Sequence, residues 1–341
     1  MKKININVPK EYHILSDKSS NGTKEQPWQE KKVKAQLIAQ SFERLGNDIK
    51  ANRLRECGTF LEFKRFIVDN SMKLNNANFC KVRLCPLCTW RRSLKIFGQV
   101  SKVMNEATKD KEHKFLFLTL TVRNCKGEEL PEVLDMMMNG YKYIFERTKV
   151  KNNILGSFRA LEITHNTNKY SKSFDTYHPH FHCILMVNRS YFNSRSDNYI
   201  SQKEWAEMWQ QSIKTDYEPI VHIQKISNSK YNIEKAVAET AKYSVKDSDL
   251  LNADNELQDR AISYLDKALV NRRLVSFRGE FAKIQKKLKL DDAIDGDLIN
   301  CDGSDDELRQ DLDFVIERYR WHVGYKQYVK LDDSNDFEKI D

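Results

Sequence analysis

The chain of 341 residues carries 57 lysine and arginine and 49 aspartate and glutamate side chains, a formal net charge of +8. This length suffices for two or three domains or one large domain, so a core can form without disulfide bonds. The longest apolar runs fall far short of the ~20 residues that span a bilayer, and the first residues lack an apolar signal core. A soluble, cytoplasmic protein with no membrane partner is therefore expected.

The positive charge is unevenly distributed. Residues 291–341 hold 16 acidic and 6 basic side chains, so residues 1–290 carry a net charge of +18. A body this basic indicates a polyanionic partner, because each lysine or arginine set against a phosphate releases condensed counterions. On charge alone, the alternative that these basic side chains only form a well-solvated surface explains the composition nearly as well as a polyanionic partner.

The N-terminal part predicts helices. Residues 1–30 are polar and rich in turn formers, so a flexible N-terminus is expected. Apolar residues at helical spacing over 33–45 predict a long amphipathic helix leading to Cys57, with Gly46 suited to a helix C-terminus. A further helix is expected over 93–109.

The central part alternates strands and helices. Residues 113–124 are rich in β-branched and aromatic side chains and predict a buried strand. The following elements are expected in chain order: a helix at 130–147, a strand at 158–164, a polar loop, a strand at 180–187, and helices at 201–215 and 231–246. The polar loop makes the last two strands an antiparallel pair. This order predicts an α+β fold.

The C-terminal part is more mixed in composition. Residues 256–290 predict further helices, and 291–310 are acidic and rich enough in glycine and serine to form a mobile loop. The stretch 314–331 is again apolar and basic enough to pack back on the body.

Two histidines begin the strand predicted at 180–187. Side chains alternate along a strand, so His180 and His182 share one face and can converge on one point. On the neighbouring predicted strand, an ionised Glu162 is costly unless it is paired or bound to a metal. If the hairpin register sets Glu162 opposite the histidines, two nitrogens and one oxygen meet and leave coordination positions open, as a catalytic metal requires.

The alternative is that these are ordinary polar residues at a strand end, with Glu162 paired to a lysine or arginine. His165, just past the first of the two strands, is a candidate fourth ligand or an outer partner of the ligands. His178 precedes Pro179 and is treated as a neighbour of the pair.

Four of the seven cysteines cluster: Cys57, Cys80, Cys85 and Cys88. Four thiolates form a tetrahedral set suited to structural Zn²⁺, and Pro86 fits the tight knuckle of such sites. Buried free cysteines are the alternative interpretation. Basic side chains that could grip DNA phosphates surround the knuckle: Lys81, Arg83, Arg91 and Arg92.

In the helix predicted at 231–246, Glu239 and Tyr243 are four residues apart and stack at the edge of the apolar stripe. Most tyrosines in this position only rest a ring on the core. Beside a divalent metal, however, a phenol can attack a phosphodiester whose oxygens the cation polarises, and a phosphotyrosine bond to DNA results. Glu239 could then activate water for a second cleavage.

Together these motifs resemble the rolling-circle plasmid replication initiators of Gram-positive bacteria, which are single-tyrosine His-hydrophobic-His endonucleases. The resemblance covers most of the chain and rests on six segments in the family's order: "FCKVRLCPLCTWRRS", "FLFLTLTVRN", "FRALEIT", "HPHFHCILMV", "AETAKYSVK" and "LDKALVNRRLVSFRG".

The resemblance implies a central antiparallel sheet with flanking helices. It also implies that Tyr243 nicks the origin strand, leaving a 5′-phosphotyrosine link, and that His180 and His182 hold Mg²⁺ or Mn²⁺ with Glu162 as third ligand. Glu239 would activate water at termination, when cleavage and rejoining end replication. The expected partners are double-stranded and single-stranded origin DNA, a host helicase and a DNA polymerase, with a homodimer left open.

The domains expected from these observations are four: a flexible N-terminus (1–30), a helical, zinc-binding and DNA-contacting region that holds the four clustered cysteines (31–112), a nicking domain (113–250) and a helical C-terminal region with an acidic loop (251–341). Three other classes stay open: a relaxase or transposase with the same chemistry, a non-catalytic zinc-stabilised DNA-binding protein, and a mononuclear iron oxygenase. The basic body argues against the oxygenase.

Overall fold

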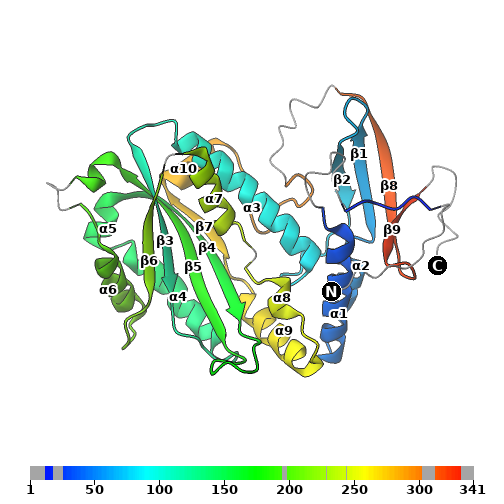
Figure 1. Cartoon of the computed structure of the whole chain (residues 1–341), viewed down its shortest axis with the longest axis horizontal. Coiled ribbons are helices and arrows are strands. Elements are labelled where there is room, and N and C mark those ends of the chain that lie inside the picture. Colours follow the sequence, from blue (N-terminus) through cyan, green and yellow to red (C-terminus); the bar gives the residue numbers. More distant parts are fainter. Residues whose placement is uncertain are drawn as a thin grey trace. The chain divides into compact units, whose positions relative to one another are not determined.

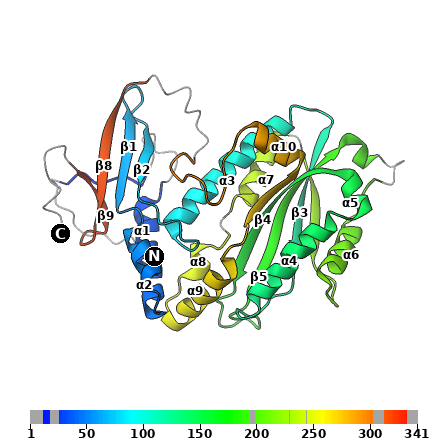
Figure 2. The ribbon, with the colours of Figure 1, turned by 180° about the vertical axis from the view of Figure 1, so that it is seen from behind.

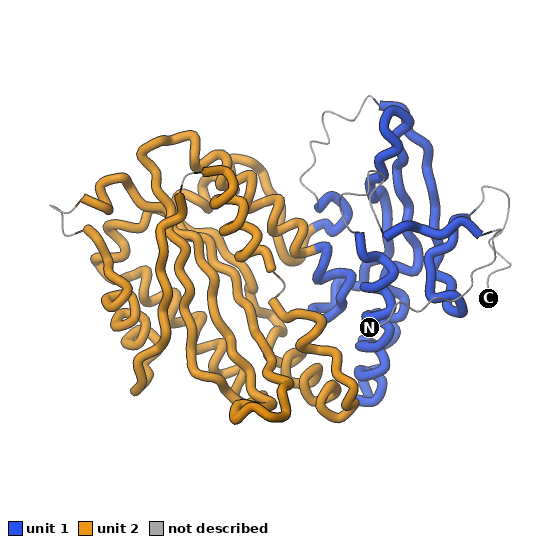
Figure 3. Tube along the Cα trace, in the orientation of Figure 1, with its two compact units in different colours: residues 1–91, 297–341 blue, residues 92–296 orange. Residues whose placement is uncertain are grey.

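The computed structural model describes residues 12–17, 26–193, 198–227, 229–242, 244–301 and 312–331. By internal packing the chain divides into two compact units, one of residues 1–91 with 297–341 and one of residues 92–296 (Figure 3). Part of the predicted acidic loop, residues 302–310, lies outside the described residues, as does most of the N-terminus predicted to be flexible.

The first unit combines helices with a four-stranded sheet whose order is β2-β1-β8-β9. Its elements are α1 (Trp28–Arg44), α2 (Asp48–Glu56), β1 (Phe60–Phe66), β2 (Met72–Ala77), the first turns of α3 (Pro86–Ala107), β8 (Phe314–His322) and β9 (Gln327–Leu331). All three strand pairings are antiparallel. The C-terminal stretch thus packs back on the body, as predicted, by adding β8 directly to β1 (Figure 1).

The single long helix predicted to lead to Cys57 is wrong. Gly46 adopts a left-handed φ of +72°, which ends α1, and the Asn47 side chain accepts a hydrogen bond from the Lys50 amide, which starts α2. The chain therefore turns between two helices. The prediction that Gly46 suits a helix C-terminus is confirmed, whereas the start of a new helix at Asn47 was not predicted, although asparagine is a typical N-cap.

The second unit is built on a five-stranded sheet of order β6-β3-β5-β4-β7, in which each pairing is antiparallel. Its strands are β3 (His113–Thr121), β4 (Ile154–His165), β5 (Tyr177–Asn188), β6 (Val221–Ile226) and β7 (Val275–Gly279). Besides the rest of α3, its helices are α4 (Leu130–Ile144), α5 (Thr148–Asn153), α6 (Gln202–Ile213), α7 (Lys230–Thr240), α8 (Asp247–Leu250), α9 (Asn255–Leu269) and α10 (Glu280–Lys287).

Helices cover both faces of this sheet. On one face lies α4 (Figure 2). There Tyr141 of α4 and Trp209 of α6 pack against the ring of Phe181. On the opposite face, Phe281 of α10 stacks on Phe115 of β3, and α7 lies over the same face (Figure 1). The α+β fold with a central antiparallel sheet and flanking helices is therefore confirmed.

The prediction that the segment 256–290 is helical is only partly correct. Between α9 and α10, strand β7 pairs with β4 at the edge of the sheet. Val275 and Phe277 suit a strand, but the run is five residues long, and a run this short cannot be told from a helix by periodicity alone. Within the described ranges, no helix combines the length and hydrophobicity needed to cross a membrane.

Gly279, which joins β7 to α10, provides a test of this packing. Its φ is +58°, and an added Cβ would lie 2.2 Å from the Leu155 carbonyl oxygen. We expect Gly279→Ala to lower the free energy of unfolding by about 3 kcal/mol, because strain and a backbone clash add. Gly46→Ala is the matched control, since Gly46 also has positive φ but nothing within 4 Å of the added atom; about 1 kcal/mol is expected there. Urea denaturation followed by circular dichroism measures both, and equal losses would contradict this account.

Candidate metal centre and active site

The β4–β5 register places Glu162 directly opposite His180. His182 lies two residues further along β5, so its side chain points to the same face. The Glu162 Oε2 atom lies 3.1 Å from Nε2 of His182 and 3.4 Å from Nε2 of His180. The structure therefore brings the three predicted ligands together, with one ligand atom of each within 4.8 Å of the others.

The second ring nitrogen of each histidine contacts the protein. Nδ1 of His180 lies 3.2 Å from the His178 carbonyl oxygen, and Nδ1 of His182 lies 3.4 Å from Oγ1 of Thr119. A carbonyl oxygen only accepts, so Nδ1 of His180 donates this hydrogen bond, and Nε2, which faces Glu162, is the nitrogen that would bind a metal. Two imidazole nitrogens and one carboxylate oxygen, with positions left open, are a donor set that fits a divalent metal.

The side chain of Glu162 is nearly buried, with 6% of its surface exposed. The Nζ atom of Lys246 lies 3.0 Å from Glu162 Oε1. Burial opposes ionisation, but the contacts with His180, His182 and Lys246 outweigh it and hold the pKa of Glu162 well below its usual range. In turn, the contact with Glu162 raises the pKa of Lys246. Lys246 was not predicted as a site residue, because no pattern in the sequence pairs it with Glu162, although it follows Tyr243 by three positions.

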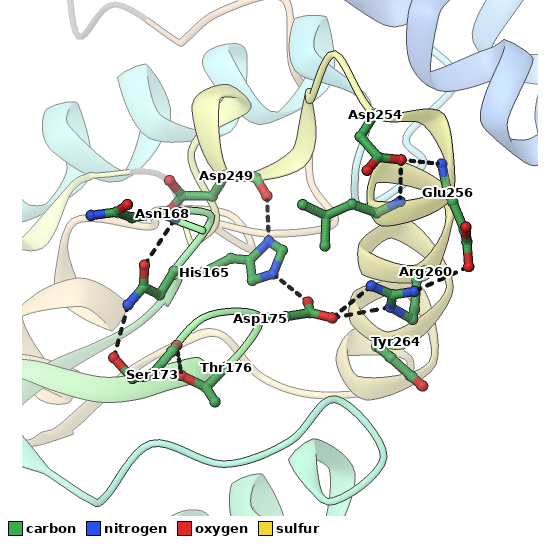
Figure 4. Close-up of polar contacts among 12 residues, drawn as sticks. His165, Asn168, Ser173, Asp175, Thr176, Asp249, Asp254, Glu256, Arg260 and Tyr264 are labelled. Carbon is green, nitrogen blue, oxygen red and sulfur yellow. Dashed lines mark hydrogen bonds and ion pairs between the residues drawn. The ribbon is translucent and has the colours of Figure 1, made fainter. Parts of the chain in front are cut away.

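The other two histidines differ in position. The ring of His178 stacks on that of His180, with centroids 5.3 Å apart, so His178 borders the cluster as a neighbour. His165 lies on the opposite face of β4 from Glu162, because it is an odd number of positions, three, further along the strand. Its nitrogens contact Asp249 and Asp175, so it is not a ligand of this cluster (Figure 4).

Helix α7 carries Glu239, whose side chain is 38% exposed and forms an ion pair with Lys242. Tyr243 lies outside the described residues. Its chain neighbour Ser244 is described, and the Ser244 carbonyl oxygen accepts a hydrogen bond from the Ile163 amide at 2.7 Å. The chain next to Tyr243 therefore runs alongside β4, one residue from Glu162.

The four clustered cysteines converge in the first unit. Sγ–Sγ distances are 3.5 Å for Cys57–Cys88 and Cys57–Cys85 and 3.7 Å for Cys80–Cys88. Four sulfurs about 2.3 Å from a zinc ion would lie roughly 3.8 Å apart, so this cluster fits tetrahedral Zn²⁺. The four thiols are free of disulfide bonds.

The surroundings of the cysteines suit thiolates. The Lys81 amide donates to Cys88 Sγ at 3.2 Å, and the Cys80 amide donates to Cys57 Sγ at 3.3 Å. Fully buried Lys32 donates to the Cys57 carbonyl oxygen at 2.7 Å. Lys32 was not predicted as part of this site, although it lies on the buried stripe of α1.

The four basic residues predicted to contact DNA are not equivalent. Lys81 is exposed and Arg83 is half-buried. Arg91 and Arg92 are buried and donate to the backbone carbonyls of Leu298 and Ile294, respectively. These arginines hold the segment 294–299 against α3, and phosphate contact by any of the four stays a prediction.

The fold and the two donor clusters define an α+β protein whose described residues form two candidate metal sites. A family model described as "Replication protein" matches residues 71–329. "Protein rep" of Bacillus amyloliquefaciens is 42% identical over 342 residues, covering 94% of this chain and 98% of that protein. "Protein rep" of Streptococcus pneumoniae serotype 2 is 38% identical over 317 residues, covering 92% and 95%. No solved structure matches the chain significantly.

The chain therefore belongs to the replication protein family. The predicted resemblance to plasmid replication initiators of the rolling-circle type is confirmed.

The cysteine cluster predicts a bound metal. We expect the purified protein to hold about one Zn²⁺ per chain that is resistant to weak chelators, and Cys85→Ser to lose it together with part of the thermal stability, because the site and the fold form together. Cys301→Ser is the control, since this buried cysteine lies outside the cluster. Elemental analysis measures both variants; full zinc retention by Cys85→Ser would contradict the assignment.

The Glu162–His180–His182 cluster predicts a second, exchangeable metal. Glu162→Gln should weaken Mn²⁺ binding about 100-fold, because the anionic ligand is lost while the shape is kept. Glu239→Gln, which changes a carboxylate outside the cluster, should leave Mn²⁺ affinity unchanged. Electron paramagnetic resonance titration of free Mn²⁺ measures both, and a Glu162→Gln affinity equal to that of the wild type would exclude Glu162 as a ligand.

Proposed function

We propose that this replication initiator nicks one strand of its plasmid origin through Tyr243, forms a 5′-phosphotyrosine link, and later cleaves and rejoins the strand to end rolling-circle replication. One observation carries the proposal. The Glu162–His180–His182 cluster lies on the same strand pair to which Ser244, the chain neighbour of Tyr243, is hydrogen-bonded.

His180, His182 and Glu162 are the residues that would hold Mg²⁺ or Mn²⁺. A divalent ion held by this donor set polarises phosphate oxygens and offsets the charge that develops on them. Lys246 adds a positive charge at the same place through its contact with Glu162. The cluster is therefore suited to bind the scissile phosphate.

The proposed reaction is a transesterification. The Tyr243 hydroxyl oxygen attacks phosphorus and loses its proton to solvent, while the bond from phosphorus to the 3′ oxygen breaks and that oxygen leaves as a hydroxyl. One phosphoester bond replaces another, so the bond energy is kept for rejoining. Glu239 is partly exposed on α7 and would accept a proton from the water that attacks in the second cleavage.

The remaining parts of the proposal concern recognition and assembly. The four-cysteine cluster would hold structural Zn²⁺ within a DNA-contacting region at 31–112, where exposed Lys81 offers a phosphate contact. The nicking domain would comprise 113–250. The substrates would be double-stranded origin DNA at initiation and single-stranded origin DNA afterwards. A host helicase and a DNA polymerase would act at the origin after the nick is made. A non-catalytic DNA-binding protein is the competing function, and it gives Glu162 no reason to be buried among two histidines.

The proposal predicts a covalent product that depends on one tyrosine. With supercoiled plasmid carrying the origin and Mn²⁺, the wild-type chain should produce nicked DNA with protein that survives denaturant, and EDTA should abolish it. Tyr243→Phe should lower the cleavage rate at least about 1,000-fold, because no other hydroxyl replaces the nucleophile. Gel electrophoresis of denatured complexes measures the product.

Tyr231→Phe is the matched control, because Tyr231 is an exposed tyrosine on α7 that should not affect the reaction. Glu239→Gln should keep the first cleavage and lose the second. Nicking by Tyr243→Phe at the wild-type rate would refute the proposed nucleophile, whereas origin binding without any nicking would favour the non-catalytic function.

A further inference from the structure

The segment 244–249 is fastened to β4 at three points. The Ile163 amide donates to the Ser244 carbonyl oxygen at 2.7 Å, and Lys246 Nζ lies 3.0 Å from Glu162 Oε1. The third point is His165, whose Nδ1 lies 3.1 Å from the Asp249 carbonyl oxygen. Glu162 and Lys246 already belong to the candidate active site, whereas His165 has no role in the reaction proposed above.

His165 is held from several sides (Figure 4). Its side chain is 1% exposed, and its ring stacks on Tyr177 with centroids 4.4 Å apart and planes 3° from parallel. Its Nε2 lies 2.9 Å from Asp175 Oδ1. Each ring nitrogen therefore lies within hydrogen-bond distance of an oxygen atom, one from Asp249 and one from Asp175.

The acceptor carboxylate is itself fixed. Arg260 of α9 donates twice to Asp175 Oδ2, through Nε at 3.1 Å and Nη2 at 2.8 Å (Figure 4). The Asp175 amide donates to the Asn166 carbonyl oxygen at 2.8 Å, which closes the β4–β5 loop directly after His165. A continuous chain of contacts therefore runs from α9 through Asp175 and His165 to Asp249.

We propose that His165 is a positioning residue for the nicking reaction, because it fixes the segment 244–249, and with it the chain next to Tyr243, against the strand that carries Glu162. This inference rests on the proposed function. His165 touches neither the candidate metal ligands nor DNA in this account, so it acts only through the segment that it holds. Misplacing a nucleophile by about 1 Å can cost up to 100-fold in rate.

The experiment compares three substitutions. His165→Phe keeps the ring that stacks on Tyr177 and removes both hydrogen bonds, whereas His165→Gln can restore one of them. His113→Phe is the matched control, because His113 also sits between a carbonyl oxygen, that of Ala107 at 3.1 Å, and a carboxylate, that of Asp110 at 3.6 Å. His113 begins β3, at the end of the sheet away from His180.

Two readouts are taken on the full chain. Hydrogen exchange of a peptide spanning 244–251 reports whether the segment is held, independently of any reaction. Single-turnover cleavage of an origin oligonucleotide at saturating concentration with Mn²⁺ reports the chemical step, and the dissociation constant of that oligonucleotide is measured beside it. Thermal unfolding checks each variant, and His165→Gln carries the test if His165→Phe does not fold.

His165→Phe should speed exchange of the 244–251 peptide about tenfold and slow cleavage about 10- to 100-fold, with DNA affinity unchanged. His165→Gln should recover part of both, and His113→Phe should change neither. Unchanged exchange in His165→Phe would overturn the inference, as would faster exchange with an unchanged cleavage rate. If the wild-type chain itself cleaves no DNA, the proposed function fails and the role of His165 with it, and this failure is visible before any substitution.

Discussion

The antiparallel register of β4 and β5 is the constraint on which the site depends. A shift by one residue would turn His180 and His182 to the face that Phe181 and Cys183 now occupy, under α4 and α6. Burial opposes this shift, because Phe181 and Cys183 are both fully buried and the Phe181 ring packs against Tyr141 and Trp209. The same packing that stabilises the sheet therefore places Glu162 opposite His180.

The buried carboxylate explains why its neighbours carry positive or proton-bearing groups. Isolated in an apolar sheet, an ionised Glu162 would be strongly destabilising. Contacts with His180, His182 and Lys246 keep it charged, and so tie the strand pair to the segment after α7. Ile163 and His165 contact that same segment. Three nearby positions of β4, 162, 163 and 165, therefore determine the charge of the site and the path of the chain next to Tyr243.

The sequence predicted those elements in which the pattern of apolar and polar side chains continues over many residues. The strands at 113–124, 158–164 and 180–187 and the convergence of Glu162 with His180 and His182 follow from alternation and the cost of a buried charge. The four cysteines follow from their spacing. By contrast, β1, β2, β6 and β7 were not predicted, since each is a run of only five to seven residues. Two of them also depend on strands far away in the sequence, because β1 pairs with β8 and β7 with β4.

The roles of Lys32, His165 and Lys246 likewise depend on tertiary contacts. Lysine on a helix normally faces solvent, and only the packed structure shows Lys32 buried below the thiols. The position of His165 in the sequence makes it a candidate fourth ligand, whereas the strand alternation turns it to the other face and toward Asp175.

The central claim, that the metal cluster serves a tyrosine at 243, is tested most directly by locating the protein–DNA bond. The covalent complex formed with a cleaved origin strand would be digested with trypsin and nuclease and sequenced by mass spectrometry. The account predicts a 5′-phosphonucleotide on Tyr243. A link at another residue, or cleaved DNA whose 5′ phosphate is free of protein, would contradict it.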